Sequence, residues 1–522
     1  MKIFKNRYVL IFLLSLFFLL ITKIDYRFIE EIRCCQDDHD YFIHAETIAV
    51  DLDFDYSNQL EGFENKRFNH NGKVAPKGFV GTGIFSSPFL FIGSLLNNFQ
   101  NSNIFNFKIL FYSLSSVVYF FLSILLIYKT LNDLKIKSNI FYISLLMLGS
   151  GLPYFAFERY SMSHIYEVFS ITCILYLSNK FLSTSENKYA FLIPIAIVLS
   201  LSVRWVNYYV IFLPFVMKLM FYKNEKSLKE NFKNKYFLLA IPISLILFSV
   251  LSKAIYGIFT FNPQFVYGTS GMMTNFLSSE TNLVEYILLN IKNLLLIFYT
   301  QEFGIIWFSP IIFIGTLLAF YLLAFNRENM LLNILILFSY LQNFAIVLIW
   351  KSTASSYGFR YLFNLVPLSI FVYYHFKNTR KSKLINYYLI TFSIIGILSL
   401  LFFETTEMTQ LSLVDEVNTF GRSLRFTEPN YLRGFIYSFL ELNSYLKIFT
   451  TSFLGAVIFK SILLLFDKNQ FISILSSYGL PVKNDDFVIY LDQIQEIEFY
   501  KFVIVIFVIY FFVKKIVDEY IS

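Results

Sequence analysis

Apolar segments long enough to cross a membrane recur along this chain, and they constrain its fold more than any other feature. Hydrophobic residues make up 56% of the 522 positions and charged residues only 15%, and the mean hydropathy is +0.58. A helix needs about 20 mainly apolar residues to cross the hydrocarbon core of a bilayer. We therefore predict an all-α integral membrane protein, a polytopic bundle of about 11–14 transmembrane helices.

About thirteen segments have the composition of such helices. They are Tyr8–Ile24, Ile104–Tyr128, Ile140–Phe157, Ile165–Leu182, Tyr189–Val203, Tyr208–Phe221, Tyr236–Ile258, Ile305–Phe325, Leu331–Ile349, Tyr361–Phe376, Leu384–Phe403, Leu446–Phe466 and Phe499–Val513. The first resembles a secretory signal peptide, but no small-residue cleavage site follows it, so we expect an uncleaved span.

Basic residues predict which side of the membrane each loop faces. Short cytoplasmic loops carry an excess of lysine and arginine. Lys2, Lys5 and Arg7 place the N-terminus in the cytoplasm, which puts the long loop 25–86 on the extracytoplasmic side. The lysines of 222–236 then fall inside. The later basic residues Arg327, Lys377, Arg380, Lys381 and Lys383 also fall inside if the apolar segment Val284–Tyr299 lies at the outer interface without crossing.

The first extracytoplasmic loop is unusually acidic. Residues 25–61 contain 11 of the 36 acidic residues of the chain, and Asp37, Asp38 and Asp40 lie within four positions. A carboxylate beside a lipid surface can act as a general base toward a hydroxyl or an amine. Carboxylates in this pattern can also bind a divalent metal. The loop is therefore predicted to carry a site; no cofactor is certain, and a metal at these three aspartates stays open.

Polar side chains from turns far apart in the sequence meet the same membrane face in this topology. An arginine at the end of a span is usually an anchor that reaches the interface, but several outer turns here each carry a polar group. Cationic side chains at one depth can hold a phosphate, which arginine binds through two parallel hydrogen bonds. The residues are Arg159, His164, Arg204, Asn207, Glu302 and Arg360.

Several short motifs follow one another in order through residues 30–370. They are Asp37 with Tyr41-Phe42, Val50–Asn58, Ala75–Gly81 with Lys77, Arg159–His164, Arg204–Asn207, Gln301–Pro310 and Ser355–Tyr361. Together they resemble bacterial polytopic glycosyltransferases of the GT-C type, a glycosyltransferase family 39-like group related to protein O-mannosyltransferases and aminoarabinose transferases. The third motif lacks the Tyr-Pro pair of that family, so its match rests on Lys77 and Gly81.

The resemblance implies a GT-C-like enzyme of the bacterial inner membrane with an extracytoplasmic active site. Its donor would be a polyprenyl-phosphate-linked sugar, its acceptor a glycan, lipid or protein of the cell envelope, and transfer would invert the anomeric carbon. We expect no nucleic-acid partner. The alternatives are an O-antigen polymerase or ligase and a flippase or transporter of lipid-linked sugars. A charged path through both leaflets would favour the transporter.

Roles follow for the candidate residues. Asp37 is the predicted base, assisted by Asp38 and Asp40. The predicted donor or phosphate ligands are Lys77, His164, Arg204 and Arg360. Acceptor binding or structural support is expected of Arg159, Asn207, Glu302 and Tyr357. We assign residues 1–403 to the glycosyltransferase domain, and 404–522 to an extracytoplasmic loop with additional transmembrane helices.

Overall fold

The computed structural model describes most of the chain between residues 36 and 518. The described residues are 36–61, 68–70, 73–76, 78, 80–99, 106–222, 233–259, 288, 291, 294–299, 304–325, 327–350, 358–379, 383–402, 431–442, 444–445, 453–478, 485–496, 498–500 and eight single positions after them. The predicted first span Tyr8–Ile24 lies outside these residues.

Local sequence signals set the ends of several helices. Asn106 begins α5 (Phe107–Asp133) by accepting a hydrogen bond from the Ile109 amide at 3.2 Å. Asn234 does the same for α11 (Lys235–Tyr256), from the Tyr236 amide at 2.9 Å. Asparagine is favoured there because its side chain satisfies an amide that the helix leaves without a partner. Gly257, with a φ of 73°, ends α11 in the left-handed conformation that glycine adopts readily.

The chain divides into two compact units, and the larger one contains Ile29–Leu400. Its longer helices are α3 (Gln36–Glu46), α4 (Val80–Phe99), α5, α6 (Ile140–Leu148), α7 (His164–Thr184), α8 (Asn187–Val203), α9 (Leu213–Phe221), α11, α14 (Pro310–Phe325), α15 (Met330–Trp350), α16 (Val366–Thr379) and α17 (Lys383–Leu401). Shorter helices are η2 (Thr47–Asp51), η4 (Tyr154–Glu158), η5 (Tyr208–Phe212), α13 (Ile305–Phe308), η7 (Arg327–Asn329) and η8 (Arg360–Leu365).

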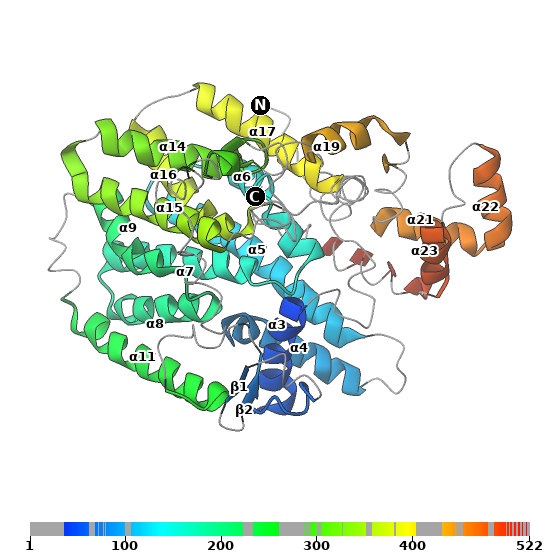
Figure 1. Cartoon of the computed structure of the whole chain (residues 1–522), viewed down its shortest axis with the longest axis horizontal. Helices are drawn as coiled ribbons and strands as arrows, with labels where there is room; N and C mark the ends of the chain where they lie inside the picture. Colours follow the sequence, from blue (N-terminus) through cyan, green and yellow to red (C-terminus); the bar gives the residue numbers. More distant parts are fainter. Residues whose placement is uncertain are drawn as a thin grey trace. The chain divides into compact units, whose positions relative to one another are not determined.

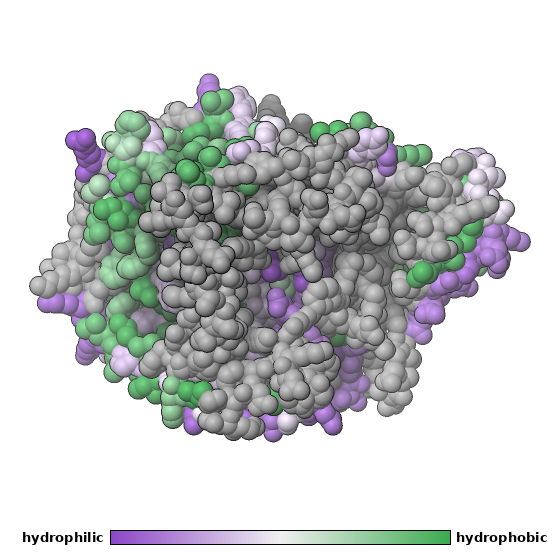
Figure 2. All heavy atoms as spheres, in the orientation of Figure 1, coloured by the Kyte–Doolittle hydropathy of each residue, from purple (hydrophilic) through white to green (hydrophobic). Residues whose placement is uncertain are grey.

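The predicted class, an α-helical membrane protein, is confirmed. Five helices among the described residues are long and apolar enough to cross a membrane: Val80–Phe99, Phe107–Asp133, Lys235–Tyr256, Met330–Leu348 and Lys383–Leu401. Apolar side chains cover much of the surface on the side where α11, α14 and α15 lie (Figure 2). On α11, Leu239, Ile246 and Leu247 are more than half exposed, as expected of a face in contact with lipid.

Neighbouring helices of the larger unit pack in sequence order. Helices α4, α5, α7, α8 and α11 each contact the next one along this series (Figure 1). A second group forms around α14, which contacts both α15 and α16. The short helix η8 contacts α7 and α15, so it joins the two groups. This junction brings residues from distant parts of the chain together.

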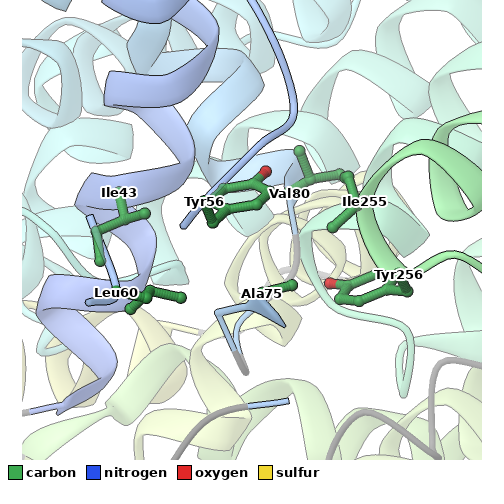
Figure 3. Close-up of a cluster of buried hydrophobic side chains, with 7 residues drawn as sticks. All are labelled: Ile43, Tyr56, Leu60, Ala75, Val80, Ile255 and Tyr256. Atoms are coloured by element: carbon green, nitrogen blue, oxygen red, sulfur yellow. The ribbon is translucent and has the colours of Figure 1, made fainter. Parts of the chain in front are cut away.

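The segment after α3 is held in place by a small hydrophobic core. This segment contains an antiparallel hairpin of β1 (Phe68–His70) and β2 (Lys73–Ala75), in which Phe68 pairs with Ala75. Figure 3 shows the core side chains Ile43, Tyr56, Leu60, Ala75, Val80, Ile255 and Tyr256. Since these residues come from α3, the following loop, β2, α4 and α11, the core fixes the acidic segment against two candidate spans.

The smaller unit contains the described residues from Arg433 onward. Its helices are α21 (Phe453–Leu463), α22 (Lys468–Ser477) and α23 (Asp485–Glu496), and α19 (Tyr431–Leu440) belongs to it for most of its length. Phe459, Phe471, Leu491 and Ile494 form part of its core.

Candidate functional site

The acidic start of α3 directs its carboxylates to different sides. Asp37 is exposed, whereas Asp38 and Asp40 are each only 1% exposed. Successive residues of an α-helix are about 100° apart around its axis, so the adjacent Asp37 and Asp38 point in different directions. Asp40 lies within electrostatic reach of the Tyr256 hydroxyl in α11. Of the three predicted catalytic aspartates, Asp37 is the one open to a ligand.

Asp38 is bound to the turn that precedes α7. Its Oδ2 accepts hydrogen bonds from Arg159 Nη2 at 2.7 Å and Nε at 3.0 Å, and its Oδ1 accepts one from Ser161 Oγ at 2.5 Å. Burial raises the pKa of Asp38, and the Arg159 guanidinium acts in the opposite direction. Both carboxylate oxygens are therefore engaged inside the protein. Arg159 is thus engaged with Asp38, and its role in acceptor binding or structural support stays a prediction.

Arg204 and Arg360 lie on the same aromatic ring. The guanidinium carbon of Arg204 is 4.1 Å from the Tyr361 ring centroid, and that of Arg360 is 5.3 Å from it. Arg204 directly follows α8, and Arg360 is the first residue of η8. The structure thus brings together two predicted phosphate ligands that are far apart in sequence. Cations are attracted to the negative face of an aromatic ring, and arginine is often found there.

Gly358 shapes the turn that leads into η8. Its φ is +68°, a left-handed conformation that residues with a side chain rarely adopt. A Cβ at this position would also lie 2.8 Å from the ring of Phe363. Glycine is therefore required to bring Phe359 and Arg360 into position.

Tyr41 lies within electrostatic reach of both the exposed Asp37 and Arg204. It lies one helical turn after Asp37, on α3. Burial and the neighbouring Asp37 carboxylate raise the pKa of Tyr41 to about 12, while the Arg204 guanidinium acts to lower it. Asp37 and Arg204 are thus both within electrostatic reach of one phenol. The site therefore combines an exposed carboxylate with two guanidinium groups.

His164 is buried beneath Arg204. Its Nδ1 lies 3.1 Å from Arg204 Nη1, and the residue is 1% exposed. The same nitrogen lies 3.5 Å from Glu167 Oε2, so it is placed between the guanidinium and the carboxylate. The predicted role of His164 was to bind the donor. In the structure, His164 contacts Arg204 and Glu167, and its role in donor binding stays a prediction.

Glu167 lies at the centre of a buried polar network and was not among the predicted site residues. Its carboxylate accepts hydrogen bonds from Arg204 Nη1 at 3.4 Å, Asn207 Nδ2 at 2.5 Å and Asn364 Nδ2 at 3.2 Å. Asn207, by contrast, was predicted. An acid in an apolar helix three residues after His164 is a sequence signal that could have identified Glu167, because a buried carboxylate requires partners.

Two glycines allow α4 to pack tightly beside the site. A Cβ on Gly81 would lie 2.4 Å from the backbone nitrogen of Val203, the residue before Arg204. A Cβ on Gly83 would lie 2.5 Å from the Cβ of His44 in α3. The first turn of α4 therefore contacts both α3, which carries Asp37, and the end of α8, which leads to Arg204.

Some predictions stay open. Lys77, Glu302 and Tyr357 lie outside the described residues. Within the described part of the chain, no group of three or more His, Cys, Asp or Glu side chains is arranged to hold a metal ion. Because both oxygens of Asp38 are engaged, a metal at the three aspartates would need a rearrangement of this segment.

No protein-family model matches the sequence, and no curated protein does so either. Among solved structures, the chain is similar to the apo form of the oligosaccharyltransferase from Archaeoglobus fulgidus, with a TM-score of 0.39 and 13% sequence identity. The match covers 85% of this chain and 55% of that one, so this chain spans about half the length of that protein.

Proposed function

We propose that this protein is a membrane glycosyltransferase of the GT-C type, which transfers a sugar from a polyprenyl-phosphate donor to an acceptor of the cell envelope on the extracytoplasmic face. The observation that carries the proposal is the combination of an exposed carboxylate, Asp37, with two guanidinium groups on one ring, those of Arg204 and Arg360. A base and a phosphate site are the two elements that such a transfer needs.

The proposed reaction is a single inverting displacement. The acceptor oxygen or nitrogen attacks the anomeric carbon, and Asp37 takes up the proton that the acceptor loses. The bond between that carbon and the phosphate oxygen breaks, and the polyprenyl phosphate leaves with the bonding electrons. Arg204 and Arg360 stabilise the charge that develops on the leaving phosphate. The products are the glycosylated acceptor and the free lipid phosphate.

The arrangement of the two arginines suits a leaving group of this kind. Arg204 is held in place by contacts with Glu167 and His164, and it packs against the Tyr361 ring. Groups fixed in advance lose little energy to reorganisation during the reaction. Asp37, by contrast, is exposed and can reach an acceptor that arrives from solvent or from the membrane surface.

The test is transfer by the purified protein, with a polyprenyl-phosphate sugar and surface glycans, lipids and proteins as acceptors. Asp37→Asn should lower the rate by about 10²–10⁴-fold, as is typical for the loss of a general base. The matched control is Asp55→Asn, which changes another exposed aspartate of the same segment and should leave transfer unchanged. Near-full transfer by Asp37→Asn would overturn the assignment of the base.

The extracytoplasmic position of the site needs its own measurement. In a background without the natural cysteines, a single cysteine at position 37 should react with a reagent that cannot cross the membrane, applied from outside. Cysteines at positions 226 and 381 should react from the cytoplasmic side alone. Labelling of position 226 but not of position 37 from outside would reverse the proposed topology.

A further inference from the structure

The buried carboxylate of Glu167 contacts residues from both sides of the candidate phosphate site. Glu167 is 1% exposed, and it lies in the first turn of α7. Its Oε2 is 3.4 Å from Arg204 Nη1, and its Oε1 accepts from the amides of Asn207 at 2.5 Å and Asn364 at 3.2 Å. Each of these partners comes from a segment that follows α7 in the sequence.

Asn364 extends this network to the second arginine. It belongs to η8, the short helix that also carries Arg360 and Tyr361. Its side-chain amide donates to Glu167 and lies 2.8 Å from Asn207 Oδ1 and 2.7 Å from Asn343 Oδ1. Glu167 is therefore bound directly to one arginine, and through Asn364 to the helix that holds the other.

The charges of the site make this carboxylate more than a packing element. Arg204 and Arg360 both lie near the Tyr361 ring, and like charges repel each other. His164 Nδ1 lies between a guanidinium and a carboxylate, 3.1 Å from Arg204 Nη1 and 3.5 Å from Glu167 Oε2. Glu167 supplies a buried negative charge to Arg204, and burial strengthens that interaction.

We propose that Glu167 is a positioning residue. It sets the orientation of Arg204 and the position of η8, so that both arginines bind one phosphate group. The inference rests on the proposed function, since it concerns the same phosphate site. Glu167 itself does not touch the substrate. Its effect on transfer is exerted through Arg204 and through the residues of η8.

Glu167→Gln tests the charge without changing the size of the side chain. A glutamine keeps one oxygen acceptor, but its amide group faces either Arg204 or the asparagines, where a donor meets a donor. Transfer measured as kcat/KM should fall at least about 10-fold. The matched control is Asp133→Asn, which removes the 2.8 Å ion pair with Lys180 in the last turns of α7 and should leave transfer unchanged.

A double-mutant cycle separates positioning from a loss of stability. In an Arg204→Gln background, Glu167→Gln should lower kcat/KM by a clearly smaller factor than in the wild type, because one of the two links through which it acts has gone. An equal factor in both backgrounds would mean that Glu167 acts independently of Arg204, and it would overturn the proposal.

Asn364→Ala keeps the test valid if Glu167→Gln does not give folded protein. This change removes the link from the carboxylate to η8 and leaves Glu167 and Arg204 intact. It should lower kcat/KM about 3- to 10-fold, and the loss should not add to that of Arg360→Gln. Additive losses would overturn the proposed link.

Direct binding of a polyprenyl monophosphate distinguishes failure of this inference from failure of the proposed function. If the wild-type protein transfers sugar and Glu167→Gln equals it in binding and transfer, the inference alone is wrong. If the wild-type protein binds the lipid phosphate without transfer, and Glu167→Gln weakens binding at least about 10-fold, the inference holds and the proposed function is wrong. If the wild-type protein neither binds the lipid phosphate nor transfers sugar, both the inference and the proposed function are wrong.

Discussion

The guanidinium of Arg204 lies over the ring of Tyr361, with 4.1 Å between the guanidinium carbon and the ring centroid. A cation–π contact contributes about 0.5–2 kcal/mol, depending on how well it is shielded from water. Tyr361→Leu should therefore raise the KM for a lipid-phosphate donor about 2- to 30-fold. Tyr361→Phe keeps the ring face and should remain within about twofold of the wild type. Equal KM values for the two variants would show that the ring face does not hold the arginine.

The pair of Asp38 and Arg159 predicts a loss of stability for Asp38→Asn. Its side chains are 2% and 12% exposed, respectively, with 2.7 Å between the charged groups. Removing one partner of a buried ion pair typically costs about 3–5 kcal/mol, since the other charge stays buried without compensation. Asp38→Asn should therefore lower the apparent Tm in detergent, whereas Asp37→Asn should leave it near the wild-type value. Equal Tm values for all three proteins would contradict this assignment.

The close approach of Gly81 to Val203 predicts an effect on a site that Gly81 does not touch. Gly81→Ala places a methyl group 2.4 Å from the Val203 backbone nitrogen, so the end of α8 must move. Overpacking of this kind costs about 1–3 kcal/mol. Because Arg204 is the next residue, transfer should also fall, measured at a temperature where the variant stays folded.

Gly93→Ala is the control for this prediction. Its added methyl group would lie 2.5 Å from the Phe107 carbonyl oxygen at the start of α5, away from α8. It should lower the Tm to a similar extent and leave the KM of the donor unchanged. Equal effects of both variants on KM would mean that α4 influences the site only through overall stability.

Stability should depend on pH through His44. Its Nε2 donates to the Gly78 carbonyl at 2.9 Å, its Nδ1 accepts from the Tyr56 hydroxyl at 2.8 Å, and burial lowers its pKa to about 4. An unfolded histidine titrates near 6.5, so between about pH 6.5 and 4 the unfolded chain binds a proton that the folded one does not. Stability should fall by about 3 kcal/mol as the pH decreases through this window, and level off below it.

The measurement for His44 is the apparent Tm between pH 7 and 4. His44→Gln should be less stable at pH 7 but show a shallower decline. His39→Gln, at an exposed position of the same helix, should follow the wild-type curve. Parallel curves for His44→Gln and the wild type would mean that this histidine does not carry the pH dependence.

The sequence allowed the fold class to be predicted, because hydrophobic length and composition report directly on membrane spans. It also indicated the segments that meet at the site: the start of α3 and the turns at Arg159, Arg204 and Arg360. It did not predict the different environments of Asp37, Asp38 and Asp40. Those depend on which side of α3 is covered by other parts of the chain, and the acidic pattern itself is the same for all three.

The centre of the site was harder to predict. Glu167, Asn343 and Asn364 are single polar residues within apolar or short helices, and each gains its role from partners far away in sequence. Asn364 and Glu167 are 197 positions apart. Side-chain pairing over such a separation is a property of the packed helices. Local periodicity and motif order do not contain it.

The network around Glu167 can form only in a fixed order during synthesis of the protein. The ribosome completes α7 before it makes Arg204, which is 37 residues after Glu167, and long before it makes Asn364. A nascent chain that ends between these positions carries an acid whose permanent partners do not yet exist. The polar centre can close only after η8 has been synthesised, so a truncation before Asn364 should leave α7 a target for quality-control proteases even though every helix up to that point is complete.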